Sequence, residues 1–162
     1  MDEEFNVECL TEHNRLRALH GCPPLVLDSS LAKQAQEHTE KMAQQNGMYH
    51  CLDESHGENL CIREVSQPKL LTGRQATLRW YSEIAKYDFS SEQNTMAGHF
   101  TQIIWKGTTR AGFGRTVGKN GCATYIAGYY APMGNYTGRY RENVPPPLNG
   151  SKYMPNDEEM GW

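Results

Sequence analysis

The sequence predicts a mixed α+β fold in a single domain. Apolar residues recur at helical spacing through the first half of the chain, and two β-rich segments punctuated by glycine follow in the second half. A length of 162 residues suits one domain with a sizeable core. We expect that domain over residues 1–148, followed by a flexible tail over 149–162, where periodicity is weak.

Composition argues against several classes of partner. The formal net charge is -3, from 16 basic and 19 acidic residues, and no basic block suggests a nucleic-acid partner. Apolar runs are too short to span a membrane. The start, Met1-Asp2-Glu3-Glu4, resembles no signal peptide and lacks the glycine that N-myristoylation requires.

Cysteine usage points to a reducing compartment. The count of five is odd, so at least one thiol is unpaired. Without a signal peptide, this pattern predicts reduced thiols in an intracellular, cytoplasmic protein. The alternative is an extracellular protein whose signal peptide has been removed. The cysteines are Cys9, Cys22, Cys51, Cys61 and Cys122.

Three helices are expected between residues 5 and 87. The first covers about 5–20, and the second runs to residue 45 from an N-cap at Asp28 or Ser29. The third covers about 72–87 and is capped by Thr72.

Polar residues on the inner faces of the first two helices are expected to be structural. Asn14 and Arg17 would tie the first helix to loops through hydrogen bonds. His38 falls on the apolar face of the second helix and is interpreted as a satisfied core histidine.

Glu83 lies at the edge of the apolar face of the third helix. An unpaired carboxylate would be costly there, so it needs an arginine, a histidine or a metal as its partner. The alternative is that the side chain reaches past the edge to water.

The stretch Gly98–Trp105 predicts about three turns of buried helix, with Thr95 as N-cap and Gly107 as stop. His99 stands near its start, where the helix dipole favours the neutral imidazole. Neutral imidazole can accept a proton or hold a metal. The alternative is a core histidine that caps a backbone group.

The remaining segments predict a long loop and a hairpin. Periodicity dissolves over 46–68, where Cys61-Ile62 is expected to open a short strand. Segments 110–117 and 122–130 alternate and are rich in β-formers, so they predict an antiparallel hairpin around 118–121.

Several motifs resemble signatures of the CAP superfamily, which comprises cysteine-rich secretory proteins, antigen-five allergens and plant pathogenesis-related proteins. The resemblance covers about residues 5–147, and the segments at Trp80–Ile84 and Glu142–Pro147 are similar to the Golgi-associated subgroup. The motifs are His13-Asn14-x-x-Arg17, Gly57-Glu58-Asn59-Leu60, Gly98-His99-Phe100-Thr101-Gln102-Ile103-Ile104-Trp105 and Tyr130-Ala131-Pro132-Met133-Gly134-Asn135.

The resemblance implies a three-layer α-β-α sandwich with a small antiparallel sheet. It also implies a central cavity where His50, Glu58, Glu83 and His99 converge. Two imidazoles and two carboxylates suit a divalent ion such as zinc. The alternative is that these groups only hydrogen-bond one another. We assign the first cavity histidine to His50 and expect His56 to be exposed.

For function, the resemblance implies a non-enzymatic binding protein. Candidate partners are a sterol or other lipid, a membrane surface at the Golgi or elsewhere in the cell, a protein partner, or a second copy in a homodimer. The alternatives are a metal-dependent hydrolase or protease and a secreted venom-allergen-like effector. The sequence contains no Gly-x-Ser-x-Gly nucleophile motif, which weighs against the hydrolase.

Overall fold

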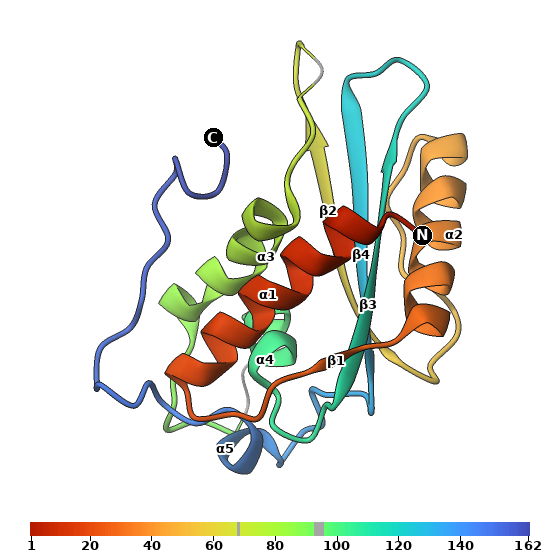
Figure 1. The fold of residues 1–162 in the computed structure, drawn as a ribbon. Helices are drawn as coiled ribbons and strands as arrows, with labels where there is room; N and C mark the ends of the chain where they lie inside the picture. Colours follow the sequence, from red (N-terminus) through yellow and green to blue (C-terminus); the bar gives the residue numbers. More distant parts are fainter. Residues whose placement is uncertain (68, 93–95) are drawn as a thin grey trace.

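The computed structural model describes residues 1–67, 69–92 and 96–162 and confirms the α-β-α sandwich. In Figure 1 the sheet stands between α2 on one face and α1, α3 and α4 on the other. The elements are α1 (Glu3–Leu19), β1 (Val26–Leu27), α2 (Ser29–Gln45), β2 (Gly57–Glu64), α3 (Gly73–Tyr81), the 3₁₀ helix η1 (Ser82–Lys86), α4 (Gly98–Ile104), β3 (Arg110–Val117), β4 (Ala123–Ala131) and α5 (Tyr140–Asn143).

The sheet has the order β1-β3-β4-β2. β3 and β4 form the predicted antiparallel hairpin, and β1 pairs with β3 in parallel. β2 is antiparallel to β4, with Glu58 opposite Tyr129. We expected this strand to open at Cys61, which was wrong: it begins at Gly57, because its partner is a distant strand that local periodicity cannot reveal.

Helix α2 packs directly on β3 through two glycines. A Cβ on Gly112 would lie 2.1 Å from the backbone N of Ala32, and one on Gly114 would lie 2.4 Å from that of Gln36. Any larger residue would push the helix off the sheet. The predicted cap of α2 is confirmed, since Asp28 accepts a hydrogen bond from the N–H of Leu31.

The third helix is shorter than expected. The α-helix ends at Tyr81 and the chain continues as η1, whereas the sequence predicts one helix to about Tyr87. Lys152 contributes to the end of η1, because its Nζ donates to the carbonyls of Ile84 and Tyr87. That lysine is remote in sequence, so helical periodicity could not show its effect.

Helix α4 is also shorter than expected. It has 7 residues, about two turns. The expected N-cap, Thr95, lies outside the described residues, and the expected stop at Gly107 was wrong. The helix ends earlier because the buried guanidinium of Arg17 takes the carbonyls of Ile103 and Trp105, at 2.9 Å and 2.8 Å.

The structural roles of Asn14 and Arg17 are confirmed. Arg17 is fully buried and also donates to the carbonyls of Pro23 and Thr108. Burial lowers the pKa of its guanidinium to about 10. Asn14 exchanges two hydrogen bonds with the backbone of Leu25, which fixes the start of β1 against α1.

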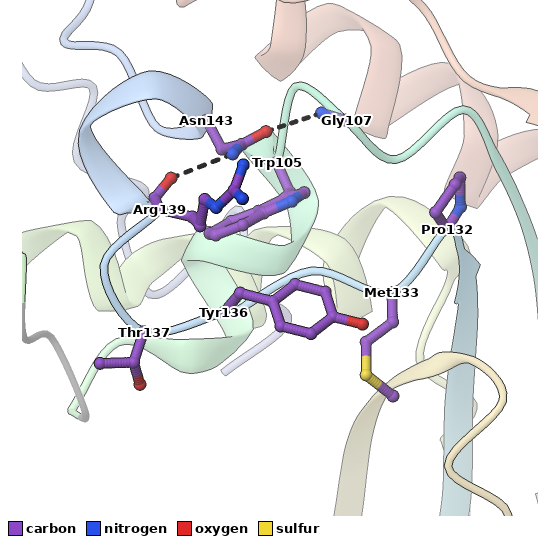
Figure 2. Close-up of a pocket in the computed structure, with 8 residues that line it drawn as sticks. All are labelled: Trp105, Gly107, Pro132, Met133, Tyr136, Thr137, Arg139 and Asn143. Carbon is purple, nitrogen blue, oxygen red and sulfur yellow. Dashed lines mark hydrogen bonds between the residues drawn. The ribbon is translucent and has the colours of Figure 1, made fainter.

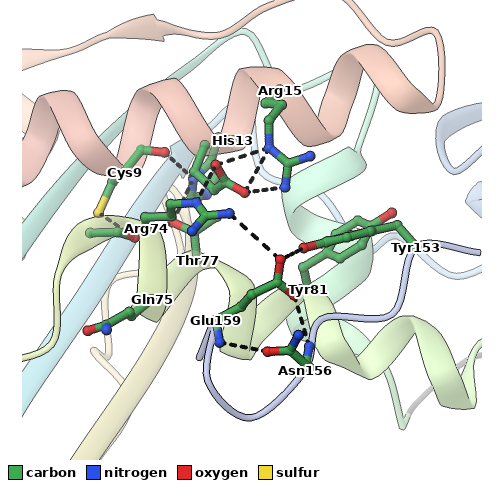
Figure 3. A network of polar contacts seen from close by, with 12 residues as sticks. Cys9, His13, Arg15, Arg74, Gln75, Thr77, Tyr81, Tyr153, Asn156 and Glu159 are labelled. Carbon is green, nitrogen blue, oxygen red and sulfur yellow. Dashed lines mark hydrogen bonds and ion pairs between the residues drawn. The ribbon is translucent and has the colours of Figure 1, made fainter. Parts of the chain in front are cut away.

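The segment 149–162, expected to be a flexible tail, has no helix or strand but is docked on the domain. Arg79 donates from Nε to the carbonyl of Met160 at 2.7 Å. Figure 3 shows Tyr153 donating to Glu159 beside Tyr81. The bond from Arg79 joins residues 81 positions apart, so weak periodicity in the segment did not reveal it.

All five cysteines are free thiols in the structure. Cys9 and Cys22 are buried, and burial raises the pKa of both thiols.

His13 is a buried histidine at the centre of the core. Its Nδ1 donates to the carbonyl of Cys9 at 2.7 Å, and its Nε2 accepts from the hydroxyl of Tyr130 at 2.8 Å. These bonds define the neutral tautomer with the proton on Nδ1. Burial lowers the pKa of His13 to about 3 from an ordinary 6.5.

Acid should therefore destabilise the fold through His13. Between pH 6.5 and 3 the unfolded chain binds a proton that the native state refuses, so this contribution is complete above 6.5 and is lost as the pH falls. At about pH 5 the loss should be about 2 kcal/mol. Urea unfolding at about pH 7.5 and 5 would measure it.

The control is His13→Gln, which removes this titration. Its free energy of unfolding should be lower than the wild type's at neutral pH but should change less between the two pH values. An equal change in both proteins would show that His13 is not responsible.

Candidate functional site

A polar cavity of about 280 Å³ contains all four residues that the sequence analysis proposed as a metal site. They come from the loop before β2, from β2, from η1 and from the start of α4. The lining residues are His50, Glu58, Asn59, Glu83, Met96, Gly98, His99 and Asn135. The structure thus brings together four proposed residues that span 49 positions of the chain, from 50 to 99.

Glu83 finds the histidine partner that its burial requires. Its Oε1 accepts from the backbone N–H of His99 at 2.8 Å, and its Oε2 lies 3.1 Å from the Nδ1 of the same residue. Burial by itself would raise the pKa of Glu83, but the hydrogen bonds and charge of His99 and the N–H of Phe100 lower it overall. Glu83 therefore also satisfies N–H groups at the start of α4.

His50 and Glu58 form the second pair. The Nδ1 of His50 lies 2.7 Å from Oε1 of Glu58, and the N–H of Cys51 donates to both carboxylate oxygens. The side chain of Glu58 is only 9% exposed, whereas that of His50 is 75% exposed. Glu58 is the fixed member, held by β2, and His50 is the accessible one.

Both imidazoles use Nδ1 to contact a carboxylate. Within the described part of the chain, Nε2 of His50 and Nε2 of His99 make no hydrogen bond. Histidines that ligate metals have this arrangement, in which a carboxylate orients the ring and the other nitrogen binds the ion. The donor set therefore fits a divalent cation, with Glu58 and Glu83 orienting the rings.

The expectation that His56 is exposed was wrong. It is 4% exposed and stacks on Tyr129, with ring centroids 3.9 Å apart. The stacking partner is on β4, remote in sequence, which is why the local pattern suggested a surface histidine.

His38 is buried as expected, but it has a neighbour that sequence reasoning missed. Its Nε2 donates to the carbonyl of Tyr49 at 2.8 Å and lies 3.5 Å from Oε2 of Glu58. Over residues 1–67, 69–92 and 96–162, one group of three metal-binding side chains has its ligand atoms within 4.8 Å of one another: His38, Cys51 and Glu58. In the sequence, the only feature that pointed to Cys51 was its position directly after His50.

A second cavity, of about 440 Å³, is shown in Figure 2. The ring of Trp105, the ring of Tyr136 and the thioether of Met133 line it, with Arg139 at its border. Asn143 closes one side by accepting from the N–H of Gly107 at 2.9 Å. The lining is mainly aromatic and apolar, which suits an apolar ligand.

Comparisons with known proteins match this chain to a family. The model of the cysteine-rich secretory protein family, CAP, matches residues 10–130. Human Golgi-associated plant pathogenesis-related protein 1 is 37% identical over 151 residues, which cover 90% of this chain and 95% of that protein. A pathogenesis-related protein of PR-1 type from Sambucus nigra is 33% identical, over 78% of this chain and 75% of its own length.

Solved structures share the fold. The crystal structure of NaASP2 with Zn2+ superposes with a TM-score of 0.71 at 23% identity, covering 99% of this chain and 95% of that one. BmVAL-1 superposes with a TM-score of 0.70 at 21% identity, covering 84% of this chain and 80% of that one.

Within the described residues, no helix combines the length and apolarity needed to cross a bilayer.

Replacing Glu83 by leucine should destabilise the protein by about 1–3 kcal/mol, because the N–H of His99 and its ring lose their acceptor. Glu83→Gln keeps one acceptor oxygen and should lose less. Urea unfolding of both variants would measure the effect, with the exposed Glu142→Gln as a control that changes stability by less than about 0.5 kcal/mol. Wild-type stability in Glu83→Leu would contradict this role.

Proposed function

The chain belongs to the cysteine-rich secretory protein (CAP) family, and we propose that it acts by binding, with a divalent metal ion such as zinc held in its polar cavity. One observation carries this proposal: His50 and His99 enter the same cavity from separate segments, each with Nδ1 engaged by a glutamate.

The chemistry of these side chains supports the metal. Neutral imidazole nitrogen is a ligand that zinc prefers, and a carboxylate on the other ring nitrogen orients the ring and raises its basicity. Two histidines leave further coordination positions for water or for a ligand. The solved relative NaASP2 is described with Zn2+, which agrees with this use of the fold.

Binding is favoured over catalysis by the number of ligands. A catalytic zinc commonly has three protein ligands, an open position and a nearby base. The cavity supplies two imidazoles, and both carboxylates are already engaged in orienting them. The nearby hydroxyl of Ser82 donates to the carbonyl of Arg79 at 2.6 Å and is not activated by a base. A metal-dependent hydrolase or protease remains the alternative.

The apolar cavity of Figure 2 supports a second candidate function, the binding of a sterol or another lipid. Its volume of about 440 Å³ falls within the roughly 300–1,000 Å³ typical of small-molecule sites. Trp105 and Tyr136 supply amphipathic rings, and Arg139 could meet a polar headgroup.

The place of action and the partners follow as part of the proposal. Similarity to a Golgi-associated human protein supports action at an intracellular membrane surface. The proposal also includes a protein partner or a second copy in a homodimer. Similarity to plant pathogenesis-related proteins supports the alternative of an extracellular, venom-allergen-like effector.

Zinc binding should depend on His99. We expect His99→Ala to weaken zinc affinity at least tenfold in titration calorimetry of the reduced protein, because a ligand is lost. Glu142→Gln, which removes an exposed carboxylate elsewhere, should leave affinity unchanged. Equal affinity in the wild type and in a His50→Ala, His99→Ala double variant would refute the cavity site.

Lipid binding should depend on Tyr136. This side chain lines the apolar cavity and is 55% exposed, so Tyr136→Asp should fold normally yet weaken co-sedimentation with sterol-containing vesicles about fivefold or more. Val117→Asp, an exposed site on β3 outside that cavity, is the matched control. If both variants sediment like the wild type, this cavity does not bind the lipid.

A further inference from the structure

The carboxylate of Glu58 lies between two imidazoles. Its Oε1 contacts Nδ1 of His50 at 2.7 Å, on the side of the polar cavity. Its Oε2 lies 3.5 Å from Nε2 of His38, which comes from α2 and does not line that cavity. Cys51 completes a separate group, because its thiol and ligand atoms of His38 and Glu58 all lie within 4.8 Å of one another.

Burial makes this group expensive without a cation. The side chains of His38 and Glu58 are 6% and 9% exposed. In the described part of the chain the ion-pair partners of Glu58 are His38 and His50, with no arginine or lysine among them. A nearly buried carboxylate without a permanent cation costs several kcal/mol, and a bound metal would offset that cost.

The neighbouring tyrosine is an independent sign of an incomplete polar site. The hydroxyl of Tyr129 is buried beside Cys51 and Glu58, but within the described residues it meets no partner at hydrogen-bonding geometry. Tyr129 faces Glu58 across the β2–β4 ladder, and its ring is 1% exposed. Buried hydroxyls almost always have a partner, so an unpaired one marks a place where a ligand, an ion or its water belongs.

We propose that His38, Cys51 and Glu58 form a second metal site, with a thiolate ligand, for zinc or a similar divalent ion. Nitrogen, sulfur and oxygen are all zinc ligands, and tetrahedral bond lengths of about 2.0–2.3 Å place ligand atoms about 3.3–3.8 Å apart. The His38–Glu58 separation of 3.5 Å already meets this value. The thiolate distinguishes this site from the polar cavity, whose lining residues include no cysteine.

An ion can reach the group from solvent. The residues that line a cavity of about 150 Å³ include His38, Cys51 and Tyr129, the acidic Glu37 and Asp53, and one cation, Lys41. This volume leaves room for a water as fourth ligand, to which the Tyr129 hydroxyl could hydrogen-bond.

Binding requires two local changes. The Cys51 thiol releases its proton to solvent as the metal–sulfur bond forms. His38 moves its ring proton from Nε2 to Nδ1 and gives up its hydrogen bond to the carbonyl of Tyr49, so Nε2 can ligate. The net result is one proton released for each ion bound.

Cobalt(II) would test the site, because thiolate coordination produces a charge-transfer band in the near ultraviolet that nitrogen and oxygen ligands do not. We expect the reduced protein to show this band on titration with Co²⁺. Cys51→Ser should abolish the band, and His38→Gln should weaken the affinity at least tenfold. Cys122→Ser is the matched control and should keep the band, because Cys122 is not part of the group.

Alkylation gives a second readout that does not depend on any variant. Zinc should slow the reaction of Cys51 with N-ethylmaleimide at least tenfold, and mass spectrometry of peptides would show little change at Cys61 and Cys122. A charge-transfer band that persists in Cys51→Ser, or no protection of Cys51 by zinc, would overturn the proposal.

The test separates this site from the proposed function. His99→Ala removes a ligand of the polar cavity but none of His38, Cys51 and Glu58, so it should keep the cobalt band. If His99→Ala no longer binds zinc in the polar cavity but keeps the cobalt band, the thiolate site is supported independently of the proposed function. Loss of the band in Cys51→Ser with cavity binding intact confirms that the two sites are distinct.

Discussion

The buried guanidinium of Arg17 is the interaction on which the site depends. It joins α1 to the carbonyls at the end of α4 and in the loop beyond it, with no exposure to solvent. Glu83 holds the other end of the same helix by accepting from the N–H of His99. Helix α4 is thus fixed at both ends by charged side chains, and a helix of 7 residues would not be stable without such tertiary contacts.

The two glutamates of the polar cavity each serve structure and chemistry together. Glu83 satisfies the start of α4 and orients His99, while Glu58 takes the N–H of Cys51 and orients His50. For Glu83, the hydrogen bonds and charge of His99 together with the N–H of Phe100 outweigh burial and lower the pKa of the carboxyl group. Because each glutamate contacts Nδ1 of a histidine, Nε2 of that histidine is left to face a ligand. The buried carboxylates therefore also orient the two rings in the cavity.

Sequence patterns correctly predicted the helices and strands that are stabilised by residues close to them in the chain. Caps and spacing located α1 and α2 within two residues, and alternation located the β3–β4 hairpin. Elements that depend on distant residues were predicted wrongly. Examples are β2, which pairs with β4, and η1, where Lys152 donates to the carbonyl of Ile84. His56 was misjudged for the same reason, because its ring packs on Tyr129 of another strand.

The sequence by itself determined the fold class, the hairpin, the structural roles of Asn14 and Arg17, and the four residues of the polar cavity, the last through a family resemblance. Only the tertiary structure decided that Nδ1 of each cavity histidine contacts a glutamate, and that His38 and Cys51 share Glu58. The physical reason is distance along the chain. Helical and strand periods report on neighbours within a few residues, whereas these contacts form between α2, β2, η1 and α4 only when the layers pack.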